Sequence, residues 1–228
     1  MTGNINNKVN WKNVKGVIFD VDGTLYDQRI LRIMMMIELA VYALKNRNAV
    51  RDLRVLHHFR RVREELATSE ANNAFHKQFE KVAAELSMNL DQVVAIVEKW
   101  IYTKPLKYME ISRFDMVGVF FDILRERGLK IGVFSDYPVE EKLIALKLNA
   151  DATCYSLESG LGKLKPQTLG LETIINRLAL DKSECVFIGD RDLRDGICAR
   201  RLGIPFILRR GRDFYKKMIV EYRHSQVK

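Results

Sequence analysis

The chain has 228 residues, of which 47% are hydrophobic and 29% are charged, and its formal net charge at neutral pH is +9. This balance is typical of a globular protein with a sizeable core and excludes a disordered chain. Residues 1–13 lack the apolar run of a signal peptide. The most membrane-like stretch, residues 30–44, is too short to span a bilayer and contains Arg32 and Glu38. We therefore expect no contact with a membrane.

Basic side chains concentrate in two regions, residues 29–63 and 200–212. A basic surface attracts phosphates of any kind, including those of nucleic acids. Neither an aromatic-interleaved stacking motif nor a nucleic-acid-binding module accompanies these regions, so solvated helix faces explain them better. We expect no nucleic-acid partner, and anionic small substrates are the next best explanation.

The three cysteines, Cys154, Cys185 and Cys198, show no metal-ligand spacing. An odd number of cysteines without such spacing is typical of buried thiols in a reducing compartment. We expect a cytoplasmic protein.

The first predicted element is a short buried strand over residues 17–19, which leads into Asp20-Val21-Asp22-Gly23-Thr24. Side chains two positions apart on a strand point to the same side, so Asp20 and Asp22 should face one pocket, and Gly23 lets the chain turn away. Two carboxylates in a small space repel each other unless a cation or a shared proton relieves them. A fold does not need this pair, but phosphoryl-transfer chemistry does.

Residues 28–104 are predicted to be almost wholly helical, because apolar residues recur at helical spacing. Asn89, followed three residues later by Gln92, predicts a helix start for residues 90–101. The run of methionines over residues 34–36 is interpreted as core filler.

From about residue 108 the pattern alternates between helix and strand. Ser112 is predicted to cap a helix that stops at Gly128, and Lys165-Pro166 to open another. The predicted strands cover residues 129–134, 151–155, 185–188 and 205–208, and the predicted helices cover residues 138–148, 166–180, 193–202 and 214–222.

Repeated β-α units imply an α/β fold with a doubly wound, mainly parallel sheet and helices on both faces. We expect residues 1–26 and 108–228 to form this core and residues 27–107 to form an all-helical cap inserted after the first strand. Ligands of open α/β sheets bind beyond the carboxyl ends of the strands, so the insertion would cover the site as a lid.

Polar residues with the right chemistry fall at those strand ends or at helix starts. They are Asp20 and Asp22, Ser135, Lys165, and Asp190 with Asp195. Together they supply a nucleophile, an acid/base, a hydroxyl donor, a cation and further carboxylates, all expected on one edge of the sheet.

These four motifs, in this order, resemble the haloacid dehalogenase (HAD) superfamily of phosphohydrolases, and within it the phosphoglycolate-phosphatase-like branch. The resemblance covers residues 14–26 and roughly 108–210, with the helical block where that superfamily places its first-type cap. It implies a Rossmann-like core and a Mg²⁺-dependent phosphomonoesterase that hydrolyses a small phosphorylated metabolite through an aspartyl-phosphate.

The resemblance implies a role for each matching residue. Asp20 would be the nucleophile, and Asp22 would protonate the leaving oxygen and then deprotonate water. Asp22 also favours ester hydrolysis, since family members that cleave carbon–halogen bonds lack this second acid. Lys165 would neutralise the nucleophile and the phosphate oxygens. Lys163 is an alternative, but a Lys-Pro pair opening a helix favours Lys165.

The phosphate contacts follow from the same resemblance. Ser135 would donate a hydrogen bond to phosphate, and Gly23 and Thr24 would offer backbone N–H groups. Asp136 departs from the family pattern, because many relatives have Asn at this position, and this could alter a phosphate contact.

Mg²⁺ prefers carboxylate and water oxygens, which suits the acidic cluster. By the resemblance, Asp20 and Asp190 would bind it through their side chains and Asp22 through its backbone carbonyl. Asp195 would act through water or as an orienting group. Asp192 competes with Asp195, which matches the spacing of several relatives.

Other functions are compatible with the same residues and fold. A phosphoryl-transferring mutase would use the same residues, with a second sugar phosphate in place of water. A non-catalytic binding protein could keep the fold, although it would not need Asp20 and Asp22 together. The stretch from Arg51 to Arg63 could contact a second anionic group of the substrate. The cap could equally form the surface of a homodimer.

Overall fold

The structure is a computed structural model that describes residues 9–69, 74–158 and 161–226. Within these residues the strands are β1 (Gly16–Phe19), β2 (Lys130–Ser135), β3 (Ala152–Tyr155), β4 (Cys185–Gly189) and β5 (Phe206–Leu208). The helices between β1 and β2 are α1 (Gln28–Lys45), α2 (Ala49–Thr68), α3 (Ala74–Leu86), α4 (Leu90–Val97), η1 (Glu98–Thr103), η2 (Lys104–Tyr108), α5 (Met109–Ser112) and α6 (Val117–Glu126). The later helices are α7 (Glu140–Ala145), α8 (Leu169–Arg177), η3 (Lys182–Glu184), η4 (Asp192–Gly196), α9 (Ile197–Leu202) and α10 (Phe214–Gln226).

The strands form one parallel sheet in the order β3-β2-β1-β4-β5. Phe19, at the end of β1, lies in register with Val133 on β2 and with Ile188 on β4. The chain segments that follow these three strands therefore leave the sheet side by side. The predicted α/β fold class, with a mainly parallel sheet between helices, is confirmed.

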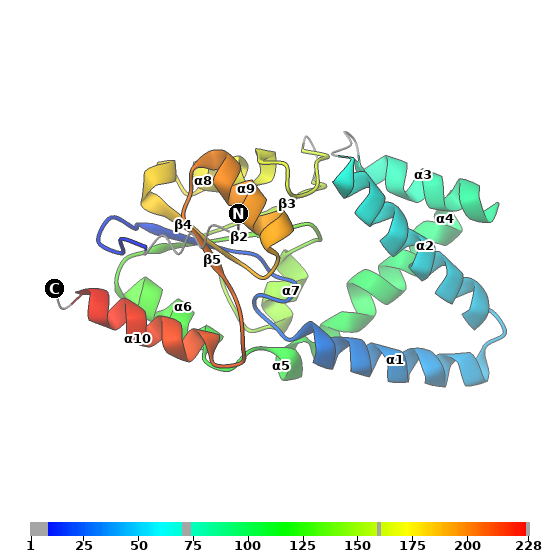
Figure 1. The fold of residues 1–228 in the computed structure, drawn as a ribbon. Helices are drawn as coiled ribbons and strands as arrows, with labels where there is room; N and C mark the ends of the chain where they lie inside the picture. Colours follow the sequence, from blue (N-terminus) through cyan, green and yellow to red (C-terminus); the bar gives the residue numbers. More distant parts are fainter. Residues whose placement is uncertain (1–8, 70–73, 159–160, 227–228) are drawn as a thin grey trace, which may run out of the picture.

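Helices cover both faces of the sheet, with α8 and α9 on one face and α6 and α10 on the other (Figure 1). The side chains of β1 alternate between these layers. Val17 and Phe19 pack with the α6 and α10 side, whereas Ile18 packs with the α8 and α9 side. Because β1 is buried on both faces, it is a continuous apolar run.

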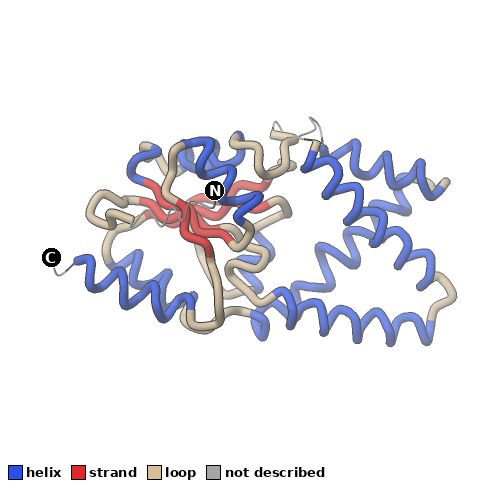
Figure 2. Tube along the Cα trace, viewed as in Figure 1, coloured by secondary structure: helices blue, strands red, loops and turns tan. Residues whose placement is uncertain are grey.

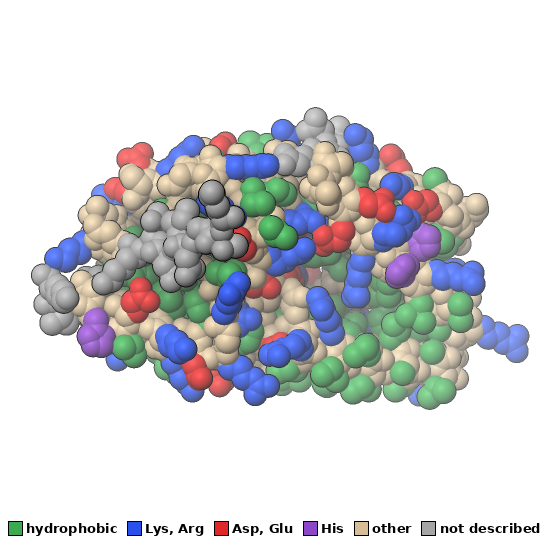
Figure 3. Space-filling view, viewed as in Figure 1, with side chains coloured by type: hydrophobic (Ala, Val, Ile, Leu, Met, Phe, Trp, Pro, Cys, Tyr) green, Lys and Arg blue, Asp and Glu red, His purple; other side chains and the backbone are tan. Residues whose placement is uncertain are grey.

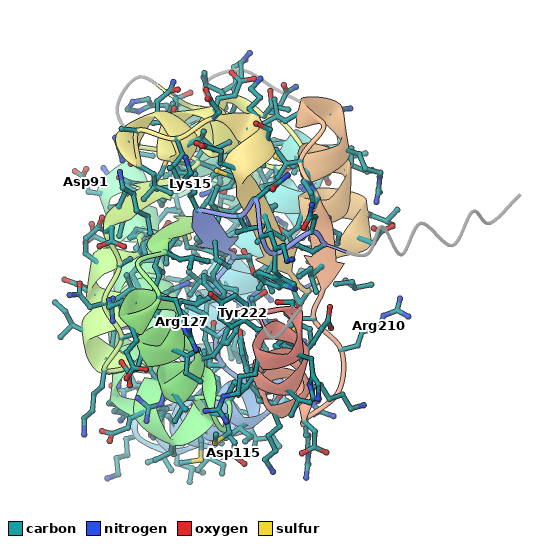
Figure 4. The ribbon with its side chains drawn as sticks, turned by 90° about the vertical axis from the view of Figure 1, so that its left-hand side faces the viewer. Lys15, Asp91, Asp115, Arg127, Arg210 and Tyr222 are labelled. Atoms are coloured by element: carbon teal, nitrogen blue, oxygen red, sulfur yellow. The ribbon has the colours of Figure 1, made fainter. Side chains whose placement is uncertain are left out.

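The C-terminal helix helps to position the acidic loop after β1. Tyr215 on α10 is fully buried, and its hydroxyl donates to the backbone oxygen of Thr24 at 2.8 Å. Tyr222 projects from α10 toward the sheet, and its ring packs edge-on against Trp11 (Figure 4). Arg210, on the segment before this helix, points away from the body of the molecule (Figure 4).

The segment from α1 to η2, residues 28–108, is here called the helical insertion. Figure 2 shows helices and short loops throughout this part of the molecule, beside the sheet. Its core joins α2, α3, α4 and η1 around Val55, Phe59, Val82, Val93 and Trp100. The predicted domain boundaries at residues 26/27 and 107/108 stay a prediction. Close to the first the chain passes from a strand into successive helices, and after the second helices and strands alternate again.

Helix α1 differs from its prediction. It forms the outer edge of the helical insertion (Figure 1), and Leu31 is its buried residue. Met36 is 62% exposed, so the interpretation of the methionine run as core filler is wrong at this position, whereas Met35 is partly buried against the cores. The apolar face of α1 exceeds what its few neighbours can cover.

Two predicted helix starts are also wrong. Ser112 ends α5, and α6 begins at Val117. The backbone oxygen of Ser112 accepts from the Asp27 N–H at 2.7 Å, and this bond joins the two connections to the helical insertion. Lys165 and Pro166 precede α8 by a turn, which directs the lysine into the sheet edge. The predicted start of α4 at Asn89 is confirmed, since its side chain accepts from the Asp91 N–H.

The three cysteines are buried and free, as predicted. No helix in the described ranges is long and apolar enough to cross a bilayer.

Candidate active site

A cavity of about 550 Å³ lies between the carboxyl ends of the strands and the helical insertion. On the sheet side it is lined by the ends of β1, β2 and β4 and by the turn before α8. The predicted site residues that line it are Asp20, Asp22, Lys165, Asp190 and Asp195. The structure thus brings together residues that are up to 175 positions apart in the chain (20 to 195).

Lys165 links two of the carboxylates. Its Nζ atom donates to Asp20 Oδ1 at 2.6 Å, to Asp195 Oδ1 at 2.8 Å and to the backbone oxygen of Phe134 at 3.1 Å. Burial alone would lower the pKa of Lys165, but the charges of Asp195 and Asp20 raise it above its ordinary value. Lys165 is therefore held in its charged form beside Asp20, whereas Lys163, the alternative, is not among the residues that line the cavity.

Asp136 holds the turn that carries Lys165. Its Oδ1 atom accepts from the Lys165 backbone N–H at 3.0 Å and from the Ser156 hydroxyl at 2.5 Å. Both partners donate to the same oxygen, an acceptor that the asparagine of many relatives also has, so these contacts do not distinguish the two residues.

The loop after β1 orients the carboxylate of Asp20. The Thr24 hydroxyl donates to Asp20 Oδ2 at 2.8 Å, while the Thr24 N–H donates within the turn to the backbone oxygen of Val21 at 3.1 Å. Thr24 therefore reaches the site through its hydroxyl, and phosphate binding by the N–H groups of Gly23 and Thr24 stays a prediction. Gly23 has φ +93°, and a Cβ atom there would lie 2.1 Å from Asp190 Oδ2. Only glycine fits this approach.

Asp190 and Asp195 complete an acidic cluster with Asp20. One carboxylate oxygen from each lies within 4.8 Å of the others. Asp192 lies outside this cluster, half-exposed and paired with Arg200 at 2.7 Å, so of the two alternatives Asp195 is the one that the structure places in the cluster.

The charge of the cluster is unbalanced. Asp190 Oδ1 is buried and has no hydrogen-bond partner among the described residues. Burial and the charge of Asp195 raise the pKa of Asp190 to about 6, and burial also raises the pKa of Asp20, although Lys165 opposes this. One ammonium facing three carboxylates leaves room for a further cation. The oxygen donors and the unpaired Asp190 oxygen fit a hard divalent ion.

Asp22 has a different environment. Lys142 Nζ on α7 donates to both of its oxygens at 2.7 Å, and the hydroxyls of Tyr26 and Ser135 donate to it as well, the latter at 3.2 Å. Burial alone would raise the pKa of Asp22, but Lys142 and the two hydroxyls more than offset it and lower the pKa. Asp22 is thus held in its ionised form.

Sequence reasoning missed Lys142 and Tyr26. Lys142 was visible as a charged residue at a helical spacing of buried apolar ones, with Val139, Leu143 and Leu146 on the same face. The apolar stripe of a helix faces the protein interior, and Lys142 lies in the first turn of α7, close to the end of β2. Tyr26 carried no comparable signal.

Two residues of the helical insertion reach across to the sheet core. The Arg63 guanidinium stacks on the Tyr137 ring at 3.8 Å, donates to Gln78 Oε1 at 2.9 Å and donates to the backbone oxygen of Asp136. Glu64 pairs with Arg191 and with Arg194, which itself donates to the Lys165 backbone oxygen at 2.7 Å. Arg63 is partly engaged in these contacts, and His57 and Arg60 of the same stretch also line the cavity, so the second anion contact stays a prediction.

Comparison with protein-family models matches residues 14–203 to the haloacid dehalogenase-like hydrolases. A search of curated protein sequences found no significant match.

Solved structures with the same fold include several activities. A 2-haloacid dehalogenase from Pseudomonas syringae pv. Tomato DC3000 has a TM-score of 0.62 and 17% identity, over 92% of this chain and 99% of that one. A β-phosphoglucomutase from Clostridium difficile has a TM-score of 0.58 and 12% identity, over 94% and 100%. A HAD phosphatase from Thermococcus onnurineus has a TM-score of 0.55 and 18% identity, over 88% and 91%. Identities this low show the fold, whereas the family match covers most of the chain. The chain belongs to the haloacid dehalogenase-like hydrolases.

Proposed function

We propose that the protein is a Mg²⁺-dependent phosphomonoesterase of the cytoplasm that acts on a small phosphorylated metabolite. The observation that carries this proposal is the pairing of Asp20, at the end of β1, with Lys165 and two further carboxylates, while Asp22 lies in the same cavity. This set supplies a nucleophile, a cation, a metal site and an acid/base.

The chemistry would proceed in two displacements. A carboxylate oxygen of Asp20 attacks phosphorus, and the bond from phosphorus to the alcohol oxygen breaks. Water then attacks the same phosphorus, which releases inorganic phosphate and restores the Asp20 carboxylate. Lys165 Nζ, 2.6 Å from Asp20 Oδ1, offsets part of the negative charge that gathers there.

Asp22 would move the protons. Its ionised form, favoured by Lys142, is the form that accepts a proton from the attacking water. In the first displacement it must instead hold a proton for the leaving alcohol. An incoming phosphate dianion competes with Asp22 for Lys142 and for the Ser135 hydroxyl, which makes a protonated Asp22 easier to form.

Mg²⁺ is proposed for the acidic cluster, held by the side chains of Asp20 and Asp190, with Asp195 nearby. Bound there, it would offset the repulsion between the nucleophile and the phosphoryl group. The presence of Asp22 supports ester hydrolysis over dehalogenation, because the resemblance associates carbon–halogen cleavage with the loss of this acid.

The test is release of inorganic phosphate from p-nitrophenyl phosphate by the wild type and by Asp20→Asn, with Mg²⁺ and with a chelator. We expect release that requires Mg²⁺ and falls at least about a thousandfold in the variant. Full activity in Asp20→Asn would contradict the nucleophile. A phosphoryl group retained on an isomer of a sugar phosphate, without phosphate release, would identify a mutase instead.

A further inference from the structure

The far wall of the cavity is mainly apolar, although Arg32, His57 and Arg60 also lie on it. It is built by the helical insertion, with Met35, Met36 and Leu39 from α1, Leu56 from α2 and Trp100 from η1. Figure 3 shows hydrophobic side chains gathered over the lower right of the molecule, where Figure 1 places α1. The wall faces the strand-end carboxylates and Lys165 across the same cavity.

Several polar groups of this wall are committed to other contacts, whereas His57 and Arg60 on α2 also line the cavity and are left to meet a polar part of a ligand. Trp100 Nε1 donates to Asp52 Oδ2 at 3.3 Å, and Arg63 donates to Gln78 and to the Asp136 backbone. Glu64 is paired with arginines of the sheet core. A substrate hydroxyl placed against the wall would give up its hydrogen bonds to water and find few replacements, which is costly.

The cavity is larger than a phosphoryl group needs. A volume of about 550 Å³ lies in the range of sites that enclose a whole small ligand. A phosphoryl group at Asp20 and Lys165 fills only one end. The rest of the cavity offers a ligand mainly the contact of apolar side chains, which stabilises a bound apolar group in proportion to the area it buries.

We infer that the substrate is the phosphate monoester of a mainly apolar alcohol or phenol. Its phosphate lies among the strand-end residues, and its carbon chain or ring lies against the wall formed by α1, α2 and η1. This inference rests on the proposed phosphatase function and specifies the substrate class of the same site. It disfavours sugar and other polyol phosphates.

The first test compares esters with matched carbon skeletons in the presence of Mg²⁺. Along the series ethyl, butyl and hexyl phosphate, kcat/KM should rise by up to about fourfold for each added methylene that is buried. Hexyl phosphate should exceed hexitol phosphate, which has the same six-carbon chain with hydroxyl groups. An equal or higher kcat/KM for hexitol phosphate overturns the inference.

Two exposed wall residues allow a variant test without disturbing the core. Met36→Ser and Leu53→Ser, both on the cavity lining, should lower kcat/KM for hexyl phosphate several-fold more than for ethyl phosphate. Ile37→Ser is the matched control, because Ile37 is an exposed apolar residue of α1 that is not part of the lining. An equal loss in all three variants overturns the inference.

Different results would contradict the phosphatase function and the apolar substrate class. No release of phosphate from any of these esters or from p-nitrophenyl phosphate overturns the phosphatase function and this inference with it. Release that does not increase with chain length overturns the substrate class alone.

Discussion

The sheet core and the helical insertion contribute to one cavity in opposite ways. The sheet core supplies charged residues whose contacts are specific: Lys165 joins Asp20 to Asp195, and Lys142 holds Asp22. The helical insertion supplies mainly apolar surface, and two of its charged residues near the cavity, Arg63 and Glu64, hold the two parts together. The difference separates two tasks. The strand ends would set the reaction, and the insertion would choose the leaving group.

The sheet core and the helical insertion also differ in how completely their apolar side chains are buried. The side chains of β1 are completely buried, and each packs into one of the two layers beside the sheet. Helix α1 carries apolar residues that are half exposed or more, such as Ile33 and Leu44. A change at a strand end should therefore alter catalysis strongly, whereas a change in the insertion should alter binding or local stability.

Outside the acidic cluster, the largest expected effect concerns the residue that holds Asp22. Lys142→Met keeps most of the side-chain volume but removes the cation from both Asp22 oxygens. We expect kcat to fall about a hundredfold with little change in KM, because one preorganised charged donor is lost. Steady-state kinetics with p-nitrophenyl phosphate measure this. Lys147→Met, at an exposed lysine paired with Glu110, is the control. Unchanged kcat in Lys142→Met would remove Lys142 from the reaction.

Gly23→Ala tests the close packing of the acidic loop. A Cβ atom at Gly23 would overlap Asp190 Oδ2, at a φ of +93° that non-glycine residues rarely adopt. We expect unfolding to become easier by about 1–3 kcal/mol and Mg²⁺ binding to weaken, since Asp190 must move. Urea unfolding and metal titration measure the two effects. Gly128→Ala has a similar φ of +74° but open space around it, so it should lose stability and leave Mg²⁺ binding intact.

Glu38→Gln tests how α1 is attached. Burial alone would raise the pKa of Glu38, but hydrogen bonds from Lys104, Lys107 and Tyr108 lower it from 4.5 to about 2. The ionised form is therefore favoured by folding above about pH 4.5, and this contribution is lost as the pH falls from 4.5 toward 2. We expect the variant to be less stable than the wild type by about 1–2 kcal/mol at pH 7. Urea unfolding should show this difference shrinking as the pH falls below 4.5. A constant difference would contradict the ionic role.

The smallest expected effect is at the boundary between the two regions. Glu64→Gln weakens the pairs with Arg191 and Arg194, and the exposure of Glu64 limits the loss of stability to about 0.5–1 kcal/mol. KM should rise several-fold, because the insertion is held less firmly over the cavity. Glu65→Gln is the matched control, since Glu65 pairs with Arg61 and Lys81 inside the helical insertion. An equal rise of KM in both variants would contradict a boundary contact.

The sequence predicted the sheet core better than the insertion for a physical reason. A parallel strand buried on both faces is a short apolar run, and the residue that follows it must lie at the sheet edge, so Asp20, Ser135 and Asp190 could be placed from their positions alone. Lys142 required knowledge of which helix face meets that edge. In α1, helical spacing predicted the helix but not how much of its apolar face, such as Met36, would stay exposed. The spacing of apolar residues defines a face but not the neighbour that covers it.

The most direct test of the central claim is to trap the covalent intermediate. The wild type is mixed with p-nitrophenyl phosphate and Mg²⁺, quenched in acid within a single turnover, digested and analysed by mass spectrometry. We expect a phosphoryl adduct on the peptide that contains Asp20, absent without Mg²⁺ and labile to hydroxylamine, as an acyl phosphate must be. Turnover that leaves Asp20 unmodified, or an adduct on another residue, would contradict it.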